Sequence, residues 1–249
     1  MIGTLINVVA ILLGGALGVA LGGRLPDRLR QTVMAGLGLF VLAIGLQMFL
    51  DTQNSLVVLG GLVIGIILGE WWQVEEGIRN LGRWLERRVM SRAASGALSE
   101  IEQAGRQERF VRGFFTASLL FCVGPIAILG SVQDGLTGNY QLLAVKSVLD
   151  GFASLAFASS LGVGVIFSTV PVLIYQGAIS LLAGQIQPLV TEAMMGEMSA
   201  TGGVLLMGIA ISSLLEIRAI RIGNFLPALV VVPLLVALLT ALGINWIIP

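Results

Sequence analysis

Long runs of apolar residues with almost no charge dominate this sequence. A helix that crosses a membrane needs about 20 mostly apolar residues, and the chain contains eight such runs. Polar segments or helix-breaking residues separate the runs, so each is predicted to be one membrane helix. We therefore predict an all-α polytopic membrane protein with residues 1–249 in a single transmembrane domain. The predicted spans are residues 2–22, 31–50, 55–72, 113–131, 141–167, 171–190, 201–217 and 223–247.

The composition supports a lipid environment and excludes several classes of function. Of the 249 residues, 56% are hydrophobic and 11% are charged, which is more apolar surface than a soluble domain of this size can bury. The absence of histidine excludes histidine triads and most zinc sites, and the single cysteine, Cys122, excludes an internal disulfide. The net charge is zero and no basic cluster carries aromatic residues, so no nucleic acid is expected as a partner. We expect neither enzymatic activity nor a cofactor or metal centre.

Two local features set the ends of individual spans. The uncharged stretch 151–191 is too long for one helix, and we place its break at residues 168–171, because Pro171 is tolerated in the first turn of a helix but not inside it. The chain runs from Met1 directly into apolar sequence, without a basic start or a cleavage site of small residues. The first segment is therefore predicted to be a spanning helix rather than a cleaved signal peptide.

Residues 73–112 differ from the rest of the chain, because arginine and glutamate are interspersed through them. Apolar residues recur at helical spacing in the first half of this segment, which predicts an amphipathic helix at the membrane surface. We interpret the segment as a charged cytoplasmic connector, and a regulatory or partner-binding role is the alternative. The recurring residues are Ile78, Leu81, Trp84, Leu85 and Val89.

The positions of the arginines indicate the orientation of the chain. If all eight runs span the membrane, successive loops lie on alternate sides and every arginine falls on one side. Arginine-rich loops face the cytoplasm, so both termini are predicted to be outside. A count of seven spans would distribute the arginines over both sides. The arginines are Arg24, Arg28, Arg30, Arg79, Arg83, Arg87, Arg88, Arg92, Arg106, Arg109, Arg112, Arg218 and Arg221.

The first three spans resemble the last three. The small residues and the distance to a following proline match between residues 11–26 and 173–188. Two shorter matches follow in the same order, pairing residues 38–46 with 203–211 and residues 54–56 with 224–226. The first and sixth spans run in opposite directions, so the second copy is inverted, as in many secondary transporters whose site lies between the repeats. We predict an inverted repeat around a central pair of spans, the fourth and the fifth.

The fourth span contains a predicted helix break. Gly124 is followed by Pro125, which lacks a backbone donor and obstructs the preceding turn, so the helix is expected to kink or break here. Backbone groups exposed at such a break can coordinate a cation or an anionic group of a substrate. A purely structural kink is the alternative. The polar candidates around the break are Ser118, Ser131, Gln133 and Asp134.

The fifth span carries an ionisable pair. Lys146, the only lysine in the chain, precedes Asp150 by four residues, so the two side chains share one helix face and can pair. Ionisable residues inside a membrane are costly and point to function. We predict that Asp150 binds a cation or proton and that Lys146 neutralises it or meets an anionic group, the alternative being an interfacial pair. Ser154 in the same span and Asn7 in the first span are further candidate ligands or interhelical hydrogen-bonding residues.

Glycines recur at every fourth position in the first and third spans. Such ridges let two helices approach closely. We interpret them as packing faces within one chain, and a homodimer face is the alternative. The two ridges are Gly14, Gly18 and Gly22, and Gly61, Gly65 and Gly69.

Three motifs are specific in combination. They are the run 118–125 followed by 130–135, the run 146–151 and the run 223–228. Together they resemble a bacterial membrane-protein family, domain of unknown function 554, also called YqgA- or YdfK-like, over essentially the whole chain. The resemblance implies a protein of the bacterial inner membrane, commonly labelled a transporter, and implies no particular substrate or catalytic residue.

These observations predict a secondary transporter or ion-coupled permease for a small polar or charged solute, with its site between the fourth and fifth spans. The lipid bilayer and an unidentified solute or ion are the expected partners. Two alternatives stay open. One is an ion or solute channel, which needs an open hydrated path, and the other is a non-transporting scaffold or sensor acting through residues 73–112.

Overall fold

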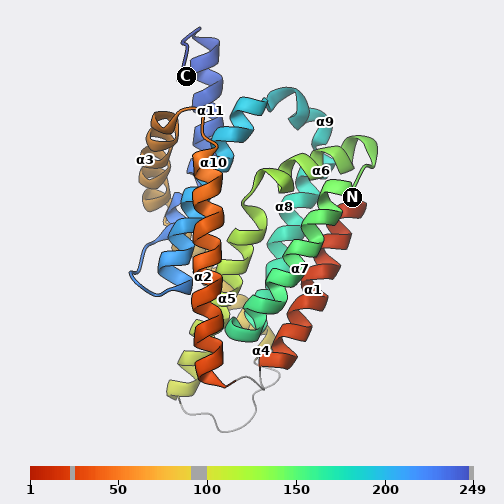
Figure 1. The fold of residues 1–249 in the computed structure, drawn as a ribbon, viewed down its shortest axis with the longest axis vertical. Helices are drawn as coiled ribbons and strands as arrows, with labels where there is room; N and C mark the ends of the chain where they lie inside the picture. The colour runs from red at the N-terminus through yellow and green to blue at the C-terminus, as the bar shows by residue number, and fades with distance from the viewer. Residues whose placement is uncertain (23–25, 91–99, 247–249) are drawn as a thin grey trace.

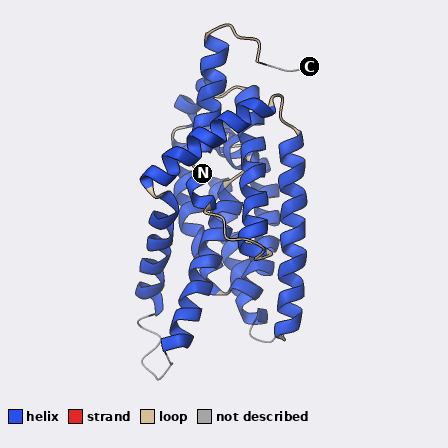
Figure 2. Cartoon of the chain, turned by 90° about the vertical axis from the view of Figure 1, so that its left-hand side faces the viewer, coloured by secondary structure: helices blue, strands red, loops and turns tan. Residues whose placement is uncertain are grey.

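The computed structural model describes residues 1–22, 26–90 and 100–246, and this part of the chain contains helices and loops but no β-strand (Figures 1 and 2). The prediction of an all-α polytopic membrane protein is confirmed. The helices are α1 (Ile2–Gly22), α2 (Asp27–Leu50), α3 (Ser55–Trp72), α4 (Val74–Met90), α5 (Glu100–Cys122), α6 (Pro125–Thr137), α7 (Gln141–Leu161), α8 (Thr169–Leu181), α9 (Ala183–Ile186), α10 (Glu192–Ile209) and α11 (Ala228–Ala241). Short 3-10 turns cover Val163–Ser168, Gln187–Leu189 and Ile222–Phe225, and a π-helical turn covers Ala210–Leu214.

The number of membrane crossings depends on α5 and α6. Within the described residues, seven helices are long and apolar enough to cross a membrane, and α5 with α6 adds an eighth if the pair, bent by 62°, is one broken span. The glycine ridge of α1 contacts α7 in ascending order along both helices, so α1 and α7 are parallel. Parallel helices require α5 and α6 together to cross once, which agrees with eight spans. The contacts pair Gly14 with Gly151, Gly18 with Leu155 and Gly22 with Ser159.

The glycine ridge of α3 packs against α11 in the opposite direction. Antiparallel packing is what the third and eighth of eight spans require. Both ridges are thus filled by helices of the same chain, in agreement with the packing interpretation. A homodimer remains a proposal, and it would need a surface other than these two ridges. The contacts of α3 pair Gly61 with Val232, Gly65 with Ala228 and Gly69 with Asn224.

The break between the fifth and sixth spans lies earlier than predicted. α7 ends at Leu161, and Gly162 has φ 81°, a backbone conformation that residues with a side chain rarely adopt. A 3-10 turn then leads into α8 at Thr169. The predicted break at residues 168–171 is wrong, because Pro171 lies in the first turn of α8, where its missing backbone donor costs nothing.

The charged connector is helical where the structure describes it. In α4, Ile78 and Leu85 pack against the interior, whereas Leu81 and Trp84 are exposed. The side chain of Val89 lies outside the described residues. α5 begins at Glu100 and continues without interruption to the break, so the charged second half of the connector and the fourth span form one helix.

The seventh span also begins earlier than predicted. α10 starts at Glu192, because the Thr191 side chain caps it by accepting a hydrogen bond from the Met194 amide at 3.2 Å. The predicted range 201–217 therefore starts too late and leaves Glu197 outside the span. Glu197 has no exposed surface, and its carboxylate is held by the loop between α2 and α3.

Candidate functional site

A group of polar side chains lies between α1, α7 and α8, which Figure 1 shows together on the right of the bundle. This buried polar cluster consists of Asn7 on α1, Lys146 and Asp150 on α7, and Gln176 on α8. Asn7 and Gln176 have no exposed surface, and Lys146 and Asp150 are each 7% exposed. The close packing of α1 on α7 brings Asn7 to Asp150 although 143 residues separate them in the sequence.

Asp150 is the centre of the cluster. Its Oδ2 forms an ion pair with Lys146 Nζ and accepts a hydrogen bond from Asn7 Nδ2 at 3.0 Å. Asn7 Nδ2 also donates to Gln176 Oε1 at 3.3 Å. A buried carboxylate is costly unless a counter-charge and donors compensate for its lost water, and these contacts supply both. Lys146 is thus buried in the pair instead of extending to the membrane surface.

Several polar atoms in and beside the cluster have no hydrogen-bond partner among the described residues. Asn7 Oδ1 and Gln176 Nε2 belong to the cluster itself. Thr4 Oγ1 on α1 and Ser180 Oγ on α8 lie about one turn further along the same helices. Buried polar atoms are almost always paired in folded proteins, so these atoms give the cluster spare capacity to bind an ion or a polar solute.

α6 covers the cluster at the end of the molecule where the chain begins (Figure 1). Asp134 on α6 is 3% exposed, and its Oδ2 accepts a hydrogen bond from the Gly3 amide and lies 3.0 Å from the α-amino nitrogen of Met1. Gly135 lets α6 approach the carbonyl of Ser180 on α8. Asp134 therefore fastens α6 to the first turn of α1, where the helix dipole favours a carboxylate.

The predicted helix break at Gly124 and Pro125 is present beside the cluster. α5 ends at Cys122, Gly124 has φ 149° and ψ 144°, and α6 begins at Pro125, whose side chain lies outside the described residues. α5 and α6, the helices on the two sides of the break, both contact α7, which carries Lys146 and Asp150. The bend therefore lies beside the helix of the ion pair.

Gly124→Ala is expected to lower the stability of the protein by about 1–3 kcal/mol, because only glycine adopts this backbone conformation without strain. Space is not the reason, since a methyl group added at Gly124 meets no atom within 4 Å. Thermal unfolding in detergent should therefore show a lower midpoint. Gly36→Ala on α2, where an added methyl group also meets no atom within 4 Å, is the control, and its midpoint should stay at the native value or rise, because alanine favours the helix. Equal midpoints for the two variants would contradict the argument.

The other predicted site residues lie around the cluster but outside it. Ser154 is fully buried and donates to the carbonyl of Ile11 at 2.9 Å, which fastens α7 to α1. Ser118 and Ser131 are buried, and each donates to the carbonyl four residues earlier at 2.6 Å. Gln133 is exposed on α6, so the structure does not bring it into the cluster. These serine hydroxyls are already used in helix packing and within their own helices.

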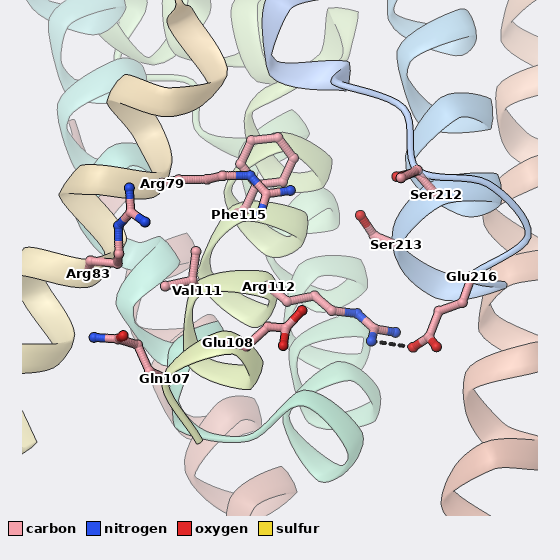
Figure 3. A pocket seen from close by; sticks show the side chains of 11 residues that line it. Arg79, Arg83, Gln107, Glu108, Val111, Arg112, Phe115, Ser212, Ser213 and Glu216 are labelled. Atoms are coloured by element: carbon pink, nitrogen blue, oxygen red, sulfur yellow. Dashed lines mark ion pairs between the residues drawn. The ribbon is translucent and has the colours of Figure 1, made fainter. Parts of the chain in front are cut away.

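A cavity of about 540 Å³ lies at the other end of the bundle, between α4, α5 and the turn that follows α10 (Figure 3). Its walls carry charges of both signs. Arg112 forms an ion pair with Glu216 across the cavity, and the Arg79 guanidinium lies 6.0 Å from the centre of the Phe115 ring. The cavity is therefore polar and is lined largely by the charged connector. Its lining residues are Arg79, Arg83, Gln107, Glu108, Val111, Arg112, Phe115, Ser212, Ser213, Glu216 and Ala219.

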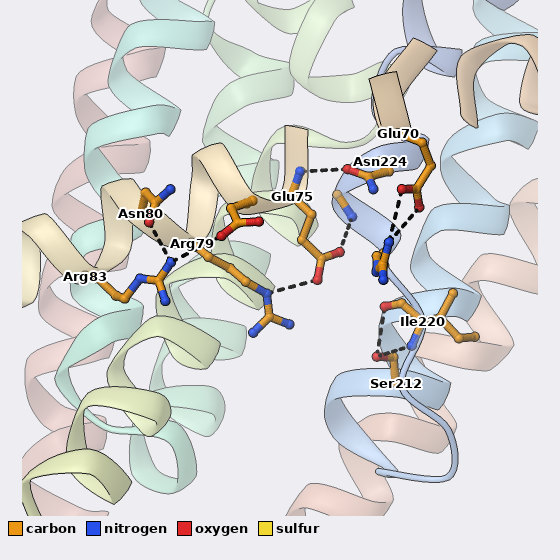
Figure 4. A network of polar contacts seen from close by, with 11 residues as sticks. Glu70, Glu75, Arg79, Asn80, Arg83, Ser212, Ile220 and Asn224 are labelled. Carbon is orange, nitrogen blue, oxygen red and sulfur yellow. Dashed lines mark hydrogen bonds and ion pairs between the residues drawn. The ribbon is translucent and has the colours of Figure 1, made fainter. Parts of the chain in front are cut away.

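A hydrogen-bonded network holds one wall of this cavity (Figure 4). Glu75 at the start of α4 is buried, and its carboxylate accepts hydrogen bonds from Arg79 Nε at 2.9 Å and from the Gly223 amide at 3.0 Å. In return, Asn224 Oδ1 accepts a hydrogen bond from the Glu75 amide at 2.8 Å. These reciprocal hydrogen bonds satisfy a free amide in the first turn of α4 and fix this helix to the turn before α11.

Arginines from the first loop and the connector meet the last loop at this end of the bundle. A second cavity, of about 520 Å³, is lined by Arg30 of α2 and Arg112 of α5 together with Glu216 after α10. Three arginine-bearing segments that are distant in sequence are therefore neighbours, as the alternation of loops predicts. Arg24 and Arg92 lie outside the described residues.

The chain is similar to bacterial proteins over nearly its whole length. A family model described as "Protein of unknown function (DUF554)" matches residues 2–237. The chain belongs to the DUF554 family. It is 32% identical over 240 residues to "Uncharacterized protein YqgA" of Escherichia coli (strain K12), covering 96% of this chain and 98% of the relative.

A second relative of this DUF554 chain is described as a membrane protein. The chain is 27% identical over 250 residues to "Uncharacterized membrane protein YdfK" of Bacillus subtilis (strain 168), covering 99% of this chain and all of the relative. No solved structure matches the chain. The resemblance predicted from the sequence motifs is thus confirmed, and the family brings no established activity.

Sequence reasoning missed Gln176 and Ser180, which α8 contributes to the cluster and its surroundings. The two residues lie four positions apart and therefore on one helix face. A side-chain amide inside an apolar span is itself a signal for a partner on another helix. That signal does not say which helix supplies the partner.

Proposed function

We propose that this member of the DUF554 family is a secondary transporter, an ion-coupled permease for a small polar or charged solute, whose site is the buried polar cluster. The observation that carries the proposal is the buried Lys146–Asp150 ion pair, beside which Asn7 Oδ1 and Gln176 Nε2 have no hydrogen-bond partner among the described residues. An intramembrane ion pair is costly to insert, and well-packed apolar residues of similar size often stabilise a fold at least as well. Function therefore explains the pair better than stability does.

The proposed site uses more helices than the sequence suggests. Lys146 and Asp150 come from the fifth span as predicted, but Asn7 comes from the first span and Gln176 from the sixth. The fourth span contributes its break, and the helices on both sides of the break contact α7. Broken helices beside a buried polar site are typical of secondary transporters.

The pairing of helices supports the inverted repeat. α1 contacts α8, α2 contacts α10 and α3 contacts α11, so each helix of the first proposed copy touches its counterpart in the second. α2 runs antiparallel to α10, as the contacts of Gly38 with Leu215 and of Gly45 with Gly203 indicate. Transporters with inverted repeats bind their substrates where the repeats meet. Asn7 and Gln176 would come from corresponding helices of the two copies.

The two ends of the bundle differ in a way that supports alternating access. α6 and the Met1 amine cover the cluster at one end, whereas the cavity of about 540 Å³ lies at the arginine-rich end. By the positive-inside rule, we place the arginine-rich end in the cytoplasm of a bacterial inner membrane and both termini outside. In this orientation the conformation is closed toward the outside.

The test is a flux screen with purified protein in liposomes and a panel of labelled ions, amino acids, organic acids and sugars. We expect the native protein to move at least one of these solutes and Asp150→Asn to slow that movement by about tenfold or more, because the variant removes the buried negative charge. Asp51→Asn changes an exposed aspartate and is the matched control with native flux. Thermal midpoints of both variants report whether they fold.

Two results would contradict the proposal. Equal flux in the native protein and in Asp150→Asn would show that the cluster is not part of the transport path. If the native protein moved no solute of the panel, the proposed transport function would be wrong. Single-channel currents in a planar bilayer would show that the protein is a channel and not a transporter. If deletion of the connector, residues 73–112, abolished the cellular function of a protein that moves no solute, the scaffold alternative would stand.

A further inference from the structure

Lys146 places an ammonium group where a bound cation would lie. Its Nζ pairs with Asp150 Oδ2, and Asn7 Nδ2 donates both to this carboxylate oxygen and to Gln176 Oε1. We propose that the Lys146 ammonium occupies the site of a monovalent alkali cation and that the cluster exchanges one such cation for one proton. This inference rests on the proposed transport function.

The ligand atoms of the cluster suit a hard cation. Carboxylate and amide oxygens are the donors that such ions prefer, and the cluster offers Asp150 Oδ2, Gln176 Oε1 and Asn7 Oδ1. Asn7 Oδ1 has no hydrogen-bond partner among the described residues and is fully buried. Rotation of an amide group exchanges its nitrogen and oxygen, so Asn7 can turn a free oxygen toward an ion at Asp150.

The charge balance of the cluster selects a monovalent ion. Asp150 and Lys146 together carry no net charge, and one alkali ion in place of the ammonium charge keeps that balance. A divalent ion would leave one uncompensated positive charge in a low-dielectric interior, which is costly. The described residues also contain no group of three or more His, Cys, Asp or Glu side chains that could hold a metal ion.

Within the described residues, Cys122 at the end of α5 and Tyr175 on α8 are the titratable side chains that these two helices bring to this part of the bundle. From α6, Asp134 lies at the covered end of the cluster, where the Met1 amine is its counter-charge. Lys146 is therefore the group that can give up a proton without leaving an unpaired charge, provided that a cation replaces it at Asp150.

The exchange step conserves atoms and charge. The Lys146 ammonium releases a proton to the side from which the cation enters and becomes a neutral amine, and the incoming cation binds the Asp150 carboxylate. When the cation leaves on the other side of the membrane, a proton returns to the amine and the ion pair re-forms. One positive charge moves in each direction, so the cycle transfers no net charge.

The experiment uses liposomes that contain the full-length protein and a pH-sensitive dye in the lumen. Pulses of NaCl, LiCl or KCl are added outside, with choline chloride as the cation too large for the cluster. We expect at least one alkali cation to make the lumen alkaline and choline to have no effect. Clamping the membrane voltage should leave the rate unchanged, because no net charge moves.

Two substitutions of Lys146 separate its proton from its charge. Lys146→Arg keeps the positive charge but cannot release a proton, so the exchange rate should fall by about tenfold or more while the thermal midpoint stays near the native value. In the native protein, the alkali chloride that drives proton movement should raise the thermal midpoint, and this rise should become larger as the pH increases. In Lys146→Gln this stabilisation should be independent of pH, because no ammonium competes for Asp150.

Several outcomes would overturn the inference. Native exchange in Lys146→Arg would show that the lysine carries no transported proton, and pH-independent cation stabilisation of the native protein would show that no proton competes with the cation. If the solute flux of the screen depends on Asp150 but no alkali cation moves protons, the exchange mechanism fails and the transporter stands. If neither solutes nor ions move, transport itself fails.

Discussion

Gly69→Ala is expected to destabilise the protein by about 3 kcal/mol, the upper part of the usual range for overpacking a close contact. A methyl group at this position would lie 1.9 Å from the backbone oxygen of Asn224 and 2.6 Å from its carbonyl carbon. Both are main-chain atoms, so α3 and the turn before α11 would have to separate. Asn224 also supplies the acceptor for the Glu75 amide, and the shift would loosen α4 as well. The thermal midpoint in detergent is the measurement.

Gly60→Ala is the matched control for this substitution. Gly60 lies on the same helix, and a methyl group added there meets no atom within 4 Å. Alanine is also a better helix former than glycine by roughly 1 kcal/mol, so the midpoint should stay the same or rise. A fall of similar size in both variants would show that helix packing at the ridge is not the cause.

Glu197→Ala should produce a larger loss, of about 4.5 kcal/mol, because three hydrogen bonds to a charged acceptor disappear at about 1.5 kcal/mol each. The carboxylate accepts from Thr52 Oγ1 at 2.6 Å, from the Gln53 amide at 2.8 Å and from the Asn54 amide at 3.0 Å. These contacts close the loop between α2 and α3 onto α10. Chemical or thermal unfolding in detergent checks the prediction.

Glu192→Ala is the control on the same helix. Glu192 is exposed in the first turn of α10, where a carboxylate gains only about 0.3–1 kcal/mol from the helix dipole. Glu197→Gln keeps one acceptor oxygen and should lie between the native protein and Glu197→Ala. If Glu197→Ala unfolded no earlier than Glu192→Ala, the buried carboxylate would have no structural role in this loop.

Local features of the sequence predicted most of the membrane spans. Runs of apolar residues mark α1, α2, α3 and α11, because a spanning helix has a minimum length and cannot carry many charges. The criterion misplaced the start of α10, where Glu197 is buried inside the fold but looks like a loop residue in the sequence. The break after α7 was predicted from Pro171 and was therefore misplaced. Proline indicates where a helix can begin, whereas the chain turns at Gly162.

Only part of the candidate site could be predicted from the sequence. Lys146 and Asp150 stand out because both are ionisable, lie in an apolar span and share one helix face. Gln176 did not stand out, because a single amide in a membrane helix has many partners available to it. Gln133 was a candidate as a polar residue after the helix break, but it lies on the exposed face of α6.

The sequence alone determined the helical class, the apolar spans, the glycine ridges and the Lys146–Asp150 pair, because each depends on composition or spacing within a single segment. Only the tertiary structure decided that the ridge of α1 meets α7 and that the ridge of α3 meets α11. A glycine ridge permits close approach but does not specify its partner. The partner of α1 is what places Asn7 beside Asp150, so the composition of the cluster follows from helix packing.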